Sequence, residues 1–170
     1  AVVAFTATAT PQVQRDIITR LALRQPFQVR ASFDRPNLFY SVTPKRHVES
    51  QILEFIHQHP DQPGIIYRAT RKAVDETADF LRMNNVNIAP YHAGMPATDR
   101  ARNQEAFRRD DVQVVVATIA FGMGIDKPNV RWVVHGDLPK NLDSYYQETG
   151  RAGRDGDPSH CHLYFSPSDA

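Results

Sequence analysis

The chain has 170 residues, of which 41% are hydrophobic and 23% charged, and a formal net charge of +1. This length is within the range of ~50–250 residues for one domain. The single cysteine, Cys161, excludes an internal disulfide and favours a reducing, cytoplasmic setting. No apolar run approaches the roughly 20 residues of a membrane span and no leader precedes Ala1, so we expect a soluble protein without membrane contact.

Short apolar runs alternate with amphipathic stretches along the chain, which is typical of an α/β fold with a parallel sheet. We expect strands at residues 1–5, 27–31, 38–43, 64–67, 88–91, 112–117, 130–135 and 160–165. Five helices are expected between some of these strands, and four of them have a predicted N-terminal cap: Thr10, Thr70, Thr98 or Asn141. The segment 34–37, Asp-Arg-Pro-Asn, breaks the pattern and is the best internal boundary.

Four segments next to apolar runs carry unusual polar residues and glycines; they are residues 68–71, 92–95, 118–127 and 151–156. In open α/β sheets, ligands bind beyond the carboxyl ends of the strands. We therefore expect all four segments to emerge at one edge of the sheet and to form a site there.

The first two segments are suited to contact phosphate. Thr70 places a hydroxyl and free backbone N–H groups at a helix start, where anions are favoured, and Arg71 adds a positive charge. Thr70 is therefore interpreted both as a cap and as a phosphate contact. Gly94 permits close backbone approach, and His92 is a candidate phosphate contact without a role in proton transfer, with a purely structural role as the alternative.

The third segment contains Gly122 and Gly124, whose turn can cradle an anion with its N–H groups. A third glycine that would open a helix is missing, so the dinucleotide-binding fingerprint is incomplete. Asp126 follows the turn directly, and its carboxylate is suited to accept hydrogen bonds from ribose hydroxyls.

The fourth segment presents Arg151 and Arg154 among three glycines. Guanidinium groups pair with phosphate oxygens in a bidentate manner, so these arginines are suited to reach across a cleft to a triphosphate. The alternative for Arg154 is a surface salt bridge to Asp155 or Asp157.

Particular stretches carry a family resemblance: residues 5–10 (FTATAT), 33–37 (FDRPN), 64–67 (GIIY), 91–94 (YHAG), 115–126 and 145–156. On these residues, the chain resembles the second motor lobe of superfamily 2 helicases and, among them, the RecQ family. The similarity covers essentially the whole chain in the correct order. It implies a RecA-like, mainly parallel sheet flanked by helices, in a lobe without its own P-loop.

The resemblance also implies roles for individual residues. Thr6 and Thr8 match the motif that couples nucleotide state to DNA, and Thr70, Arg71, His92 and Thr118 are expected along the single-stranded DNA track. Nucleotide contacts are expected from Gln147, Asp126, Gly124, Arg151 and Arg154. Of these, Arg154 is in the position of the arginine finger, and Arg151 positions the nucleotide. The family has a small residue where this chain has Arg68, which puts the local packing in question.

The sequence contains neither a G-x-x-x-x-G-K-[S/T] motif nor an Asp-Glu-x-His box. We therefore expect a fragment of a larger motor, in which ATP and Mg²⁺ are bound mainly by a first RecA-like lobe that is absent here. Residues 1–33 are expected to be the end of that first lobe, and residues 34–170 the second lobe. The fragment alone is expected to be inactive as an ATP hydrolase.

No zinc site is expected in this segment, because His160 and His162 of a strand face one side and Cys161 the other.

The resemblance implies an ATP-dependent 3′-to-5′ DNA helicase that acts in recombination and repair. Its expected partners are single-stranded and duplex DNA, the first lobe and, through regions outside this chain, a single-strand-binding protein. It would be cytoplasmic and nucleoid-associated in bacteria, or nuclear in eukaryotes. Three alternatives remain: an RNA helicase lobe, a non-catalytic nucleic-acid-binding module and an unrelated dinucleotide-binding enzyme.

Overall fold

The computed structural model describes residues 2–5, 10–29, 34–122 and 125–169. The chain splits into two compact units, Ala1–Arg35 and Pro36–Ala170. Thr6, Thr8 and Gly124, three of the predicted functional residues, lie outside the described residues. In the described parts of the chain, no helix has the length and apolarity needed to cross a membrane.

The described residues of the first unit form one helix, α1 (Pro11–Arg20), which begins as the sequence predicts. Thr10 caps it, since its Oγ1 accepts a hydrogen bond from the Val13 amide at 3.3 Å, and proline occupies the first helical position. None of the residues of α1 is buried.

The strands expected at 1–5 and 27–31 are wrong for the residues that the structure describes, because 2–5 and 27–29 form no strand. Phe5 and Phe27 are more than nine-tenths exposed. An apolar segment becomes a strand only when a neighbouring strand satisfies its backbone groups and covers its side chains. The described part of this unit offers no such neighbour.

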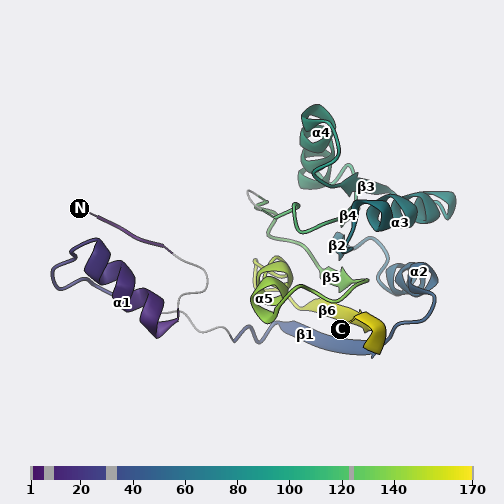
Figure 1. Ribbon diagram of the computed structural model, residues 1–170. Coiled ribbons are helices and arrows are strands. Elements are labelled where there is room, and N and C mark those ends of the chain that lie inside the picture. The colour runs from purple at the N-terminus through teal and green to yellow at the C-terminus, as the bar shows by residue number, and fades with distance from the viewer. Residues whose placement is uncertain (1, 6–9, 30–33, 123–124, 170) are drawn as a thin grey trace. The chain divides into compact units, whose positions relative to one another are not determined.

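The second unit is built on a six-stranded sheet, counted over the described residues, in which every pairing is parallel (Figure 1). The strand order is β1-β6-β5-β2-β4-β3. The strands are β1 (Leu38–Pro44), β2 (Gly64–Tyr67), β3 (Ile88–Tyr91), β4 (Val114–Ala117), β5 (Trp132–His135) and β6 (Ser159–Phe165). The helices are α2 (Val48–Gln58), α3 (Arg71–Met83), α4 (Ala97–Arg108) and α5 (Leu142–Thr149), and a 3₁₀ turn, η1 (Pro167–Asp169), follows β6.

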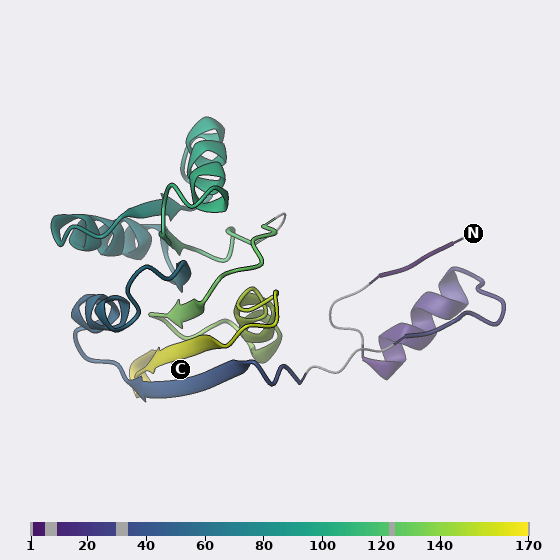
Figure 2. The same cartoon turned by 180° about the vertical axis from the view of Figure 1, so that it is seen from behind.

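Helices cover both faces of this sheet. On one face, α2 and α3 contribute Val48, Ile52, Val74 and Leu81 to a core that includes the fully buried Trp132. On the other face, α4, the connection from β4 to β5 and the segment after α5 close a second core with Phe107, Phe121 and Ala152. Seen from both sides, α2 and α5 lie on opposite sides of the β5–β6 pair (Figure 1, Figure 2). The central strands β2, β4 and β5 are buried at every position, as is usual in parallel sheets.

Local capping signals placed two of the three predicted starts in this unit correctly. Thr70 Oγ1 accepts from the Ala73 amide at 3.1 Å, and Asn141 Oδ1 accepts from the Ser144 amide at 2.8 Å. The cap expected at Thr98 is wrong, because α4 begins at Ala97 after Pro96 and has no side-chain cap. The rigid φ of proline directs the chain into this helix instead.

Candidate functional site

The carboxyl ends of β2, β3 and β4 bring several of the predicted residues together. Thr70 and Arg71 follow β2 and start α3, and the side chain of Arg71 lies across Gly94, after β3. A Cβ atom on Gly94 would lie 3.1 Å from Arg71 Cδ, so glycine makes this approach possible. The Thr118 amide donates to Tyr91 O at 3.2 Å, which joins the segment after β4 to the same edge.

His92 is buried at this edge, and both of its ring nitrogens are already engaged. Nδ1 accepts a hydrogen bond from the Gly94 amide at 3.1 Å, which leaves Nε2 as the donor to Asp75 Oδ1 at 3.0 Å. In this arrangement Nε2 carries the proton that is donated to Asp75. The geometry therefore favours the structural role, in which His92 shapes the turn that Arg71 crosses.

The expectation that all four segments meet at one edge is wrong for residues 151–156. This segment follows α5 and precedes β6, and because all the strands are parallel, it lies at the amino ends of the strands. It contacts instead the long connection from β4 to β5, which crosses from one edge of the sheet to the other. The Gly153 amide donates to Val130 O at 2.8 Å at the end of that connection.

Arg154 and Asp126 form a pair within this second group. Arg154 Nη1 donates to Ile125 O at 3.0 Å and lies 3.3 Å from Asp126 Oδ1. The Asp126 side chain is 92% exposed and that of Arg154 36% exposed, so solvent reaches both. The alternative pairing of Arg154 with Asp155 or Asp157 is wrong, since both of these carboxylates pair with the Arg131 guanidinium.

Arg151 is held more firmly than Arg154. Its Nη1 donates to Gly122 O at 2.6 Å, and a Cβ atom on Gly122 would lie 2.5 Å from Arg151 Nη2. Its Nε is buried and has no hydrogen-bond partner among the described residues. This orphaned donor fits an anionic ligand such as a nucleotide phosphate. Gln147 is exposed on α5, one turn before Arg151.

A buried polar layer under Arg151 was not predicted from the sequence. His135 Nε2 donates to Glu148 Oε2 at 2.6 Å, and both side chains are almost fully buried. The Tyr67 hydroxyl donates to Phe121 O at 2.9 Å. Burial raises the pKa of Tyr67, against the opposing effect of the nearby Arg151 charge, so the hydroxyl stays a donor at neutral pH. The sequence signal for this layer is weak, because residues 135 and 148 are 13 positions apart on different elements.

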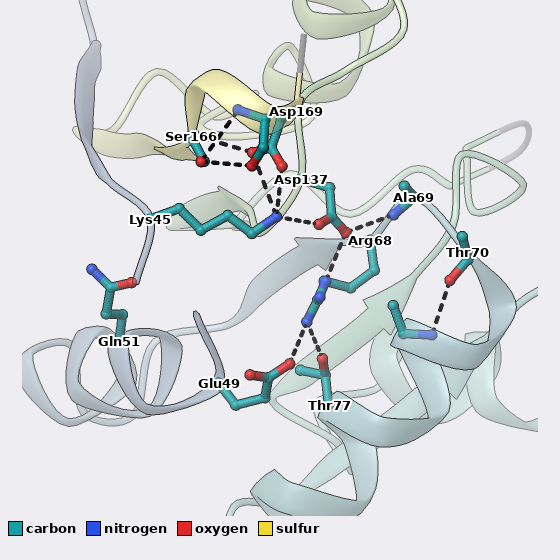
Figure 3. A network of polar contacts seen from close by, with 12 residues as sticks. Lys45, Glu49, Gln51, Arg68, Ala69, Thr70, Thr77, Asp137, Ser166 and Asp169 are labelled. Carbon is teal, nitrogen blue, oxygen red and sulfur yellow. Dashed lines mark hydrogen bonds and ion pairs between the residues drawn. The ribbon is translucent and has the colours of Figure 1, made fainter. Parts of the chain in front are cut away.

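The sequence left open how the large charged side chain of Arg68 is packed, and the structure shows where it lies. Its guanidinium is buried at the end of β2 and pairs with Asp137 at 2.8 Å and Glu49 at 3.0 Å (Figure 3). The aspartate follows β5, and no short sequence pattern connects it with Arg68. This pair was therefore missed.

No group of three or more histidine, cysteine or acidic side chains suited to a metal is present in residues 2–5, 10–29, 34–122 and 125–169. In β6, Cys161 packs into the core beside α5, whereas His162 contacts Phe55 of α2 on the other face. The two side chains thus point to opposite faces, as strand alternation requires.

A comparison with known protein families shows the family to which the chain belongs. Residues 47–156 match the family "Helicase conserved C-terminal domain". The chain therefore belongs to the family of helicase C-terminal domains.

Within this family, the chain is similar to RecQ proteins along nearly its whole length. It is 48% identical over 168 residues to the ATP-dependent DNA helicase RecQ of Pasteurella multocida, covering 99% of this chain and 27% of that protein. It is 45% identical over 168 residues to the RecQ of Bacillus subtilis, covering 99% of this chain and 28% of that protein. The chain thus spans little more than a quarter of these relatives.

A solved structure shares the fold. The structure described as S. cerevisiae Dbp5 bound to RNA and ADP BeF3 aligns with a TM-score of 0.79 at 20% identity, covering 95% of this chain and 44% of that chain. The RecA-like parallel sheet that the sequence resemblance implies is therefore confirmed.

Proposed function

We propose that this chain is the C-terminal motor lobe of a RecQ-type ATP-dependent DNA helicase that unwinds duplexes with 3′-to-5′ polarity in recombination and repair. The identity of 48% over 168 residues to a RecQ carries the proposal. The family match also disfavours the dinucleotide-binding alternative, which already lacks its third glycine.

The geometry supports a role of the second residue group at a nucleotide. When bound with Mg²⁺, ATP supplies the phosphoryl group whose transfer drives the motor, and an absent first lobe would provide most of its contacts. Arg151, with its orphaned Nε, would position a phosphate, Asp126 would accept hydrogen bonds from ribose hydroxyls, and Gln147 would contact the nucleotide. Arg154 would leave Asp126 as the lobes close and stabilise negative charge on the transferred group.

The first residue group supports a track for a nucleic-acid backbone. Thr70 and Arg71 sit at the N-terminus of α3, where unpaired N–H groups and the helix dipole favour anions. Thr118 begins the neighbouring segment. Contacts of this kind bind phosphate and carry little base information. They therefore do not separate DNA from RNA, and an experiment must do so.

Unwinding assays with the full-length protein test the proposal. DNA and RNA duplexes of the same sequence, each with a 3′ or a 5′ single-stranded tail, should be compared with ATP present. We expect unwinding of the 3′-tailed DNA duplex. Unwinding of RNA alone would favour the RNA helicase alternative, for which the RNA-bound Dbp5 structure is the relevant fold precedent. Binding without ATP-dependent unwinding would favour the non-catalytic module.

Arg71→Ala and Thr118→Ala should each weaken the binding of single-stranded DNA to the full-length protein by a similar factor for all sequences, because phosphate contacts do not read bases. The salt dependence of Arg71→Ala should fall by about one unit of slope. Fluorescence anisotropy titrations at several salt concentrations measure both effects. Arg82→Ala, which removes a cation from the other end of α3, is the matched control. A sequence-selective loss would refute the backbone assignment.

The 170-residue chain alone should hydrolyse ATP no faster than background, with or without DNA. The reason is that the sequence has neither a P-loop nor an Asp-Glu-x-His box. A phosphate-release assay at high protein concentration tests this expectation. DNA-stimulated hydrolysis by this chain would contradict the view that the site is divided between two lobes.

A further inference from the structure

At the carboxyl edge of the sheet, the carboxylate of Asp137 contacts residues of two other loops (Figure 3). Its Oδ1 lies 2.6 Å from Lys45 Nζ, just after β1. Its Oδ2 accepts hydrogen bonds from Arg68 Nε at 2.8 Å and from the Ala69 amide at 2.9 Å, both after β2. Asp137 itself lies between β5 and α5, so one side chain connects the exits of three strands.

Outer groups complete the network. Arg68 Nη1 also donates to Glu49 Oε1 of α2 and to Thr77 Oγ1 of α3, and Lys45 Nζ lies 3.2 Å from Asp169 Oδ1. The Arg68 side chain is 7% exposed. Two cations thus face three carboxylates, and Arg68 has its charge neutralised inside the protein. It is not presented to a phosphate backbone, unlike the exposed Arg71 three residues later.

The electrostatics agree with a persistent ion pair. Burial disfavours the charged form of Asp137, but hydrogen bonds from Lys45 and Arg68 and from the Ala69 amide outweigh it and lower the pKa to about 2. The carboxylate therefore stays ionised at neutral pH. The Ala69 amide immediately precedes Thr70, so this hydrogen bond holds the backbone where α3 begins.

We propose that Asp137 and Arg68 form a positioning pair, which fixes the loop of Ala69, Thr70 and Arg71 for nucleic acid and links it to the start of α5. This inference rests on the proposed function, because it deepens the role of Thr70 and Arg71. Arg68, which stands where the resembled family has a small residue, would thus act by holding Asp137 and would not contact the ligand. Asp137 also lies five residues before α5, the helix that carries Gln147 and precedes Arg151.

Asp137→Asn is the variant that tests the pair, and Asp169→Asn is its matched control. Both substitutions remove one negative charge next to Lys45, and the two aspartates have side chains that are 18% and 17% exposed. Only Asp137 contacts the Ala69 amide and Arg68. Both variants are made in the full-length protein, and their thermal unfolding is recorded first. If Asp137→Asn does not fold, Arg68→Lys replaces it, because lysine keeps the charge and cannot make both guanidinium contacts.

Hydrogen–deuterium exchange provides a readout that does not depend on activity. In Asp137→Asn, amides of the peptide covering residues 68–72 should exchange roughly tenfold faster, as expected when a hydrogen bond to a charged group is lost. Exchange in β4 should be unchanged. Asp169→Asn should exchange like the wild type throughout. Equal exchange of residues 68–72 in the two variants would overturn the proposal.

The second readout separates positioning from general destabilisation. In Asp137→Asn, the DNA concentration for half-maximal ATPase should rise about threefold to tenfold, while the turnover number at saturating DNA stays near that of the wild type. A merely structural role would lower the turnover number through loss of folded protein and leave the half-maximal concentration unchanged, and that result would refute the pair's role. Arg68→Met combined with Asp137→Asn should be less impaired than the sum of the single effects, because the two residues act through one contact.

The two proposals fail in distinguishable ways. If the wild-type protein shows no DNA-stimulated ATPase, the proposed function is wrong, and the exchange of residues 68–72 alone decides whether Asp137 positions the loop. If DNA stimulates the ATPase of the wild type but Asp137→Asn behaves like its control Asp169→Asn, the proposed function stands and the positioning pair is refuted.

Discussion

Replacing Arg154 by alanine in the full-length protein should lower the turnover number of DNA-stimulated ATP hydrolysis by about 10³–10⁵, the contribution of arginine fingers in related phosphoryl transfer. Unwinding should be lost with it. The affinities for DNA and for nucleotide should remain nearly intact, because a finger arginine acts mainly on the transition state. In the structure, the guanidinium is held by one carbonyl and by the exposed Asp126. These contacts are weak enough to exchange for a phosphoryl group as the lobes close.

Steady-state ATPase at saturating DNA, beside a nucleotide-binding titration of the same variant, measures this effect. Arg131→Ala is the control, since it removes a neighbouring arginine that pairs with Asp155 and Asp157. If Arg154 only makes a surface ion pair, its loss costs ~0–1 kcal/mol of stability and little activity. Near-normal turnover would transfer the finger role to Arg151 or abolish it.

Gly64→Ala should lower the free energy of unfolding of the chain by about 1–3 kcal/mol, the usual cost of overpacking a core. A Cβ atom at this position would lie 2.1 Å from ring atoms of Trp132, which is fully buried on the neighbouring strand β5. The ring cannot move aside because the core of α2 and α3 surrounds it. Urea denaturation followed by circular dichroism measures the loss.

A second substitution tests the cause. Trp132→Leu removes the ring that the new methyl group would meet, although it leaves space of its own. The double variant Gly64→Ala with Trp132→Leu should therefore be more stable than the sum of the two single effects predicts. Strict additivity would show that the cost of Gly64→Ala arises elsewhere.

Much of the fold of the second unit could be predicted from local sequence. The bounds of β2 and β3 agree with the expected ones, and α3 and α5 begin after their predicted caps Thr70 and Asn141. A cap depends on hydrogen bonds within three residues, and a buried parallel strand reads as a short apolar run. Such signals need no knowledge of distant segments. The predicted strands in the first unit failed because pairing partners are not a local property.

The candidate site divides in the same way. That Thr70, Arg71 and Thr118 lie at strand ends followed from the alternation of strands and helices. The position of residues 151–156 was not predicted, because these residues follow a helix and not a strand. A segment that follows a helix and precedes a parallel strand lies at the amino ends of the strands. That both ring nitrogens of His92 are engaged could be seen only from the positions of Asp75 and of the Gly94 amide.

The sequence by itself determined the motifs, their order and the family resemblance, since these are written in residue types and spacing. The tertiary structure alone decided which charges meet. Arg68 and Asp137 are 69 positions apart, yet β2 and β5 are neighbours in the sheet, so their carboxyl ends place the guanidinium and the carboxylate 2.8 Å apart. Attraction between charges falls with distance in space and is indifferent to separation along the chain, so the fold decided that Arg68 became an internal ion pair rather than a surface cation.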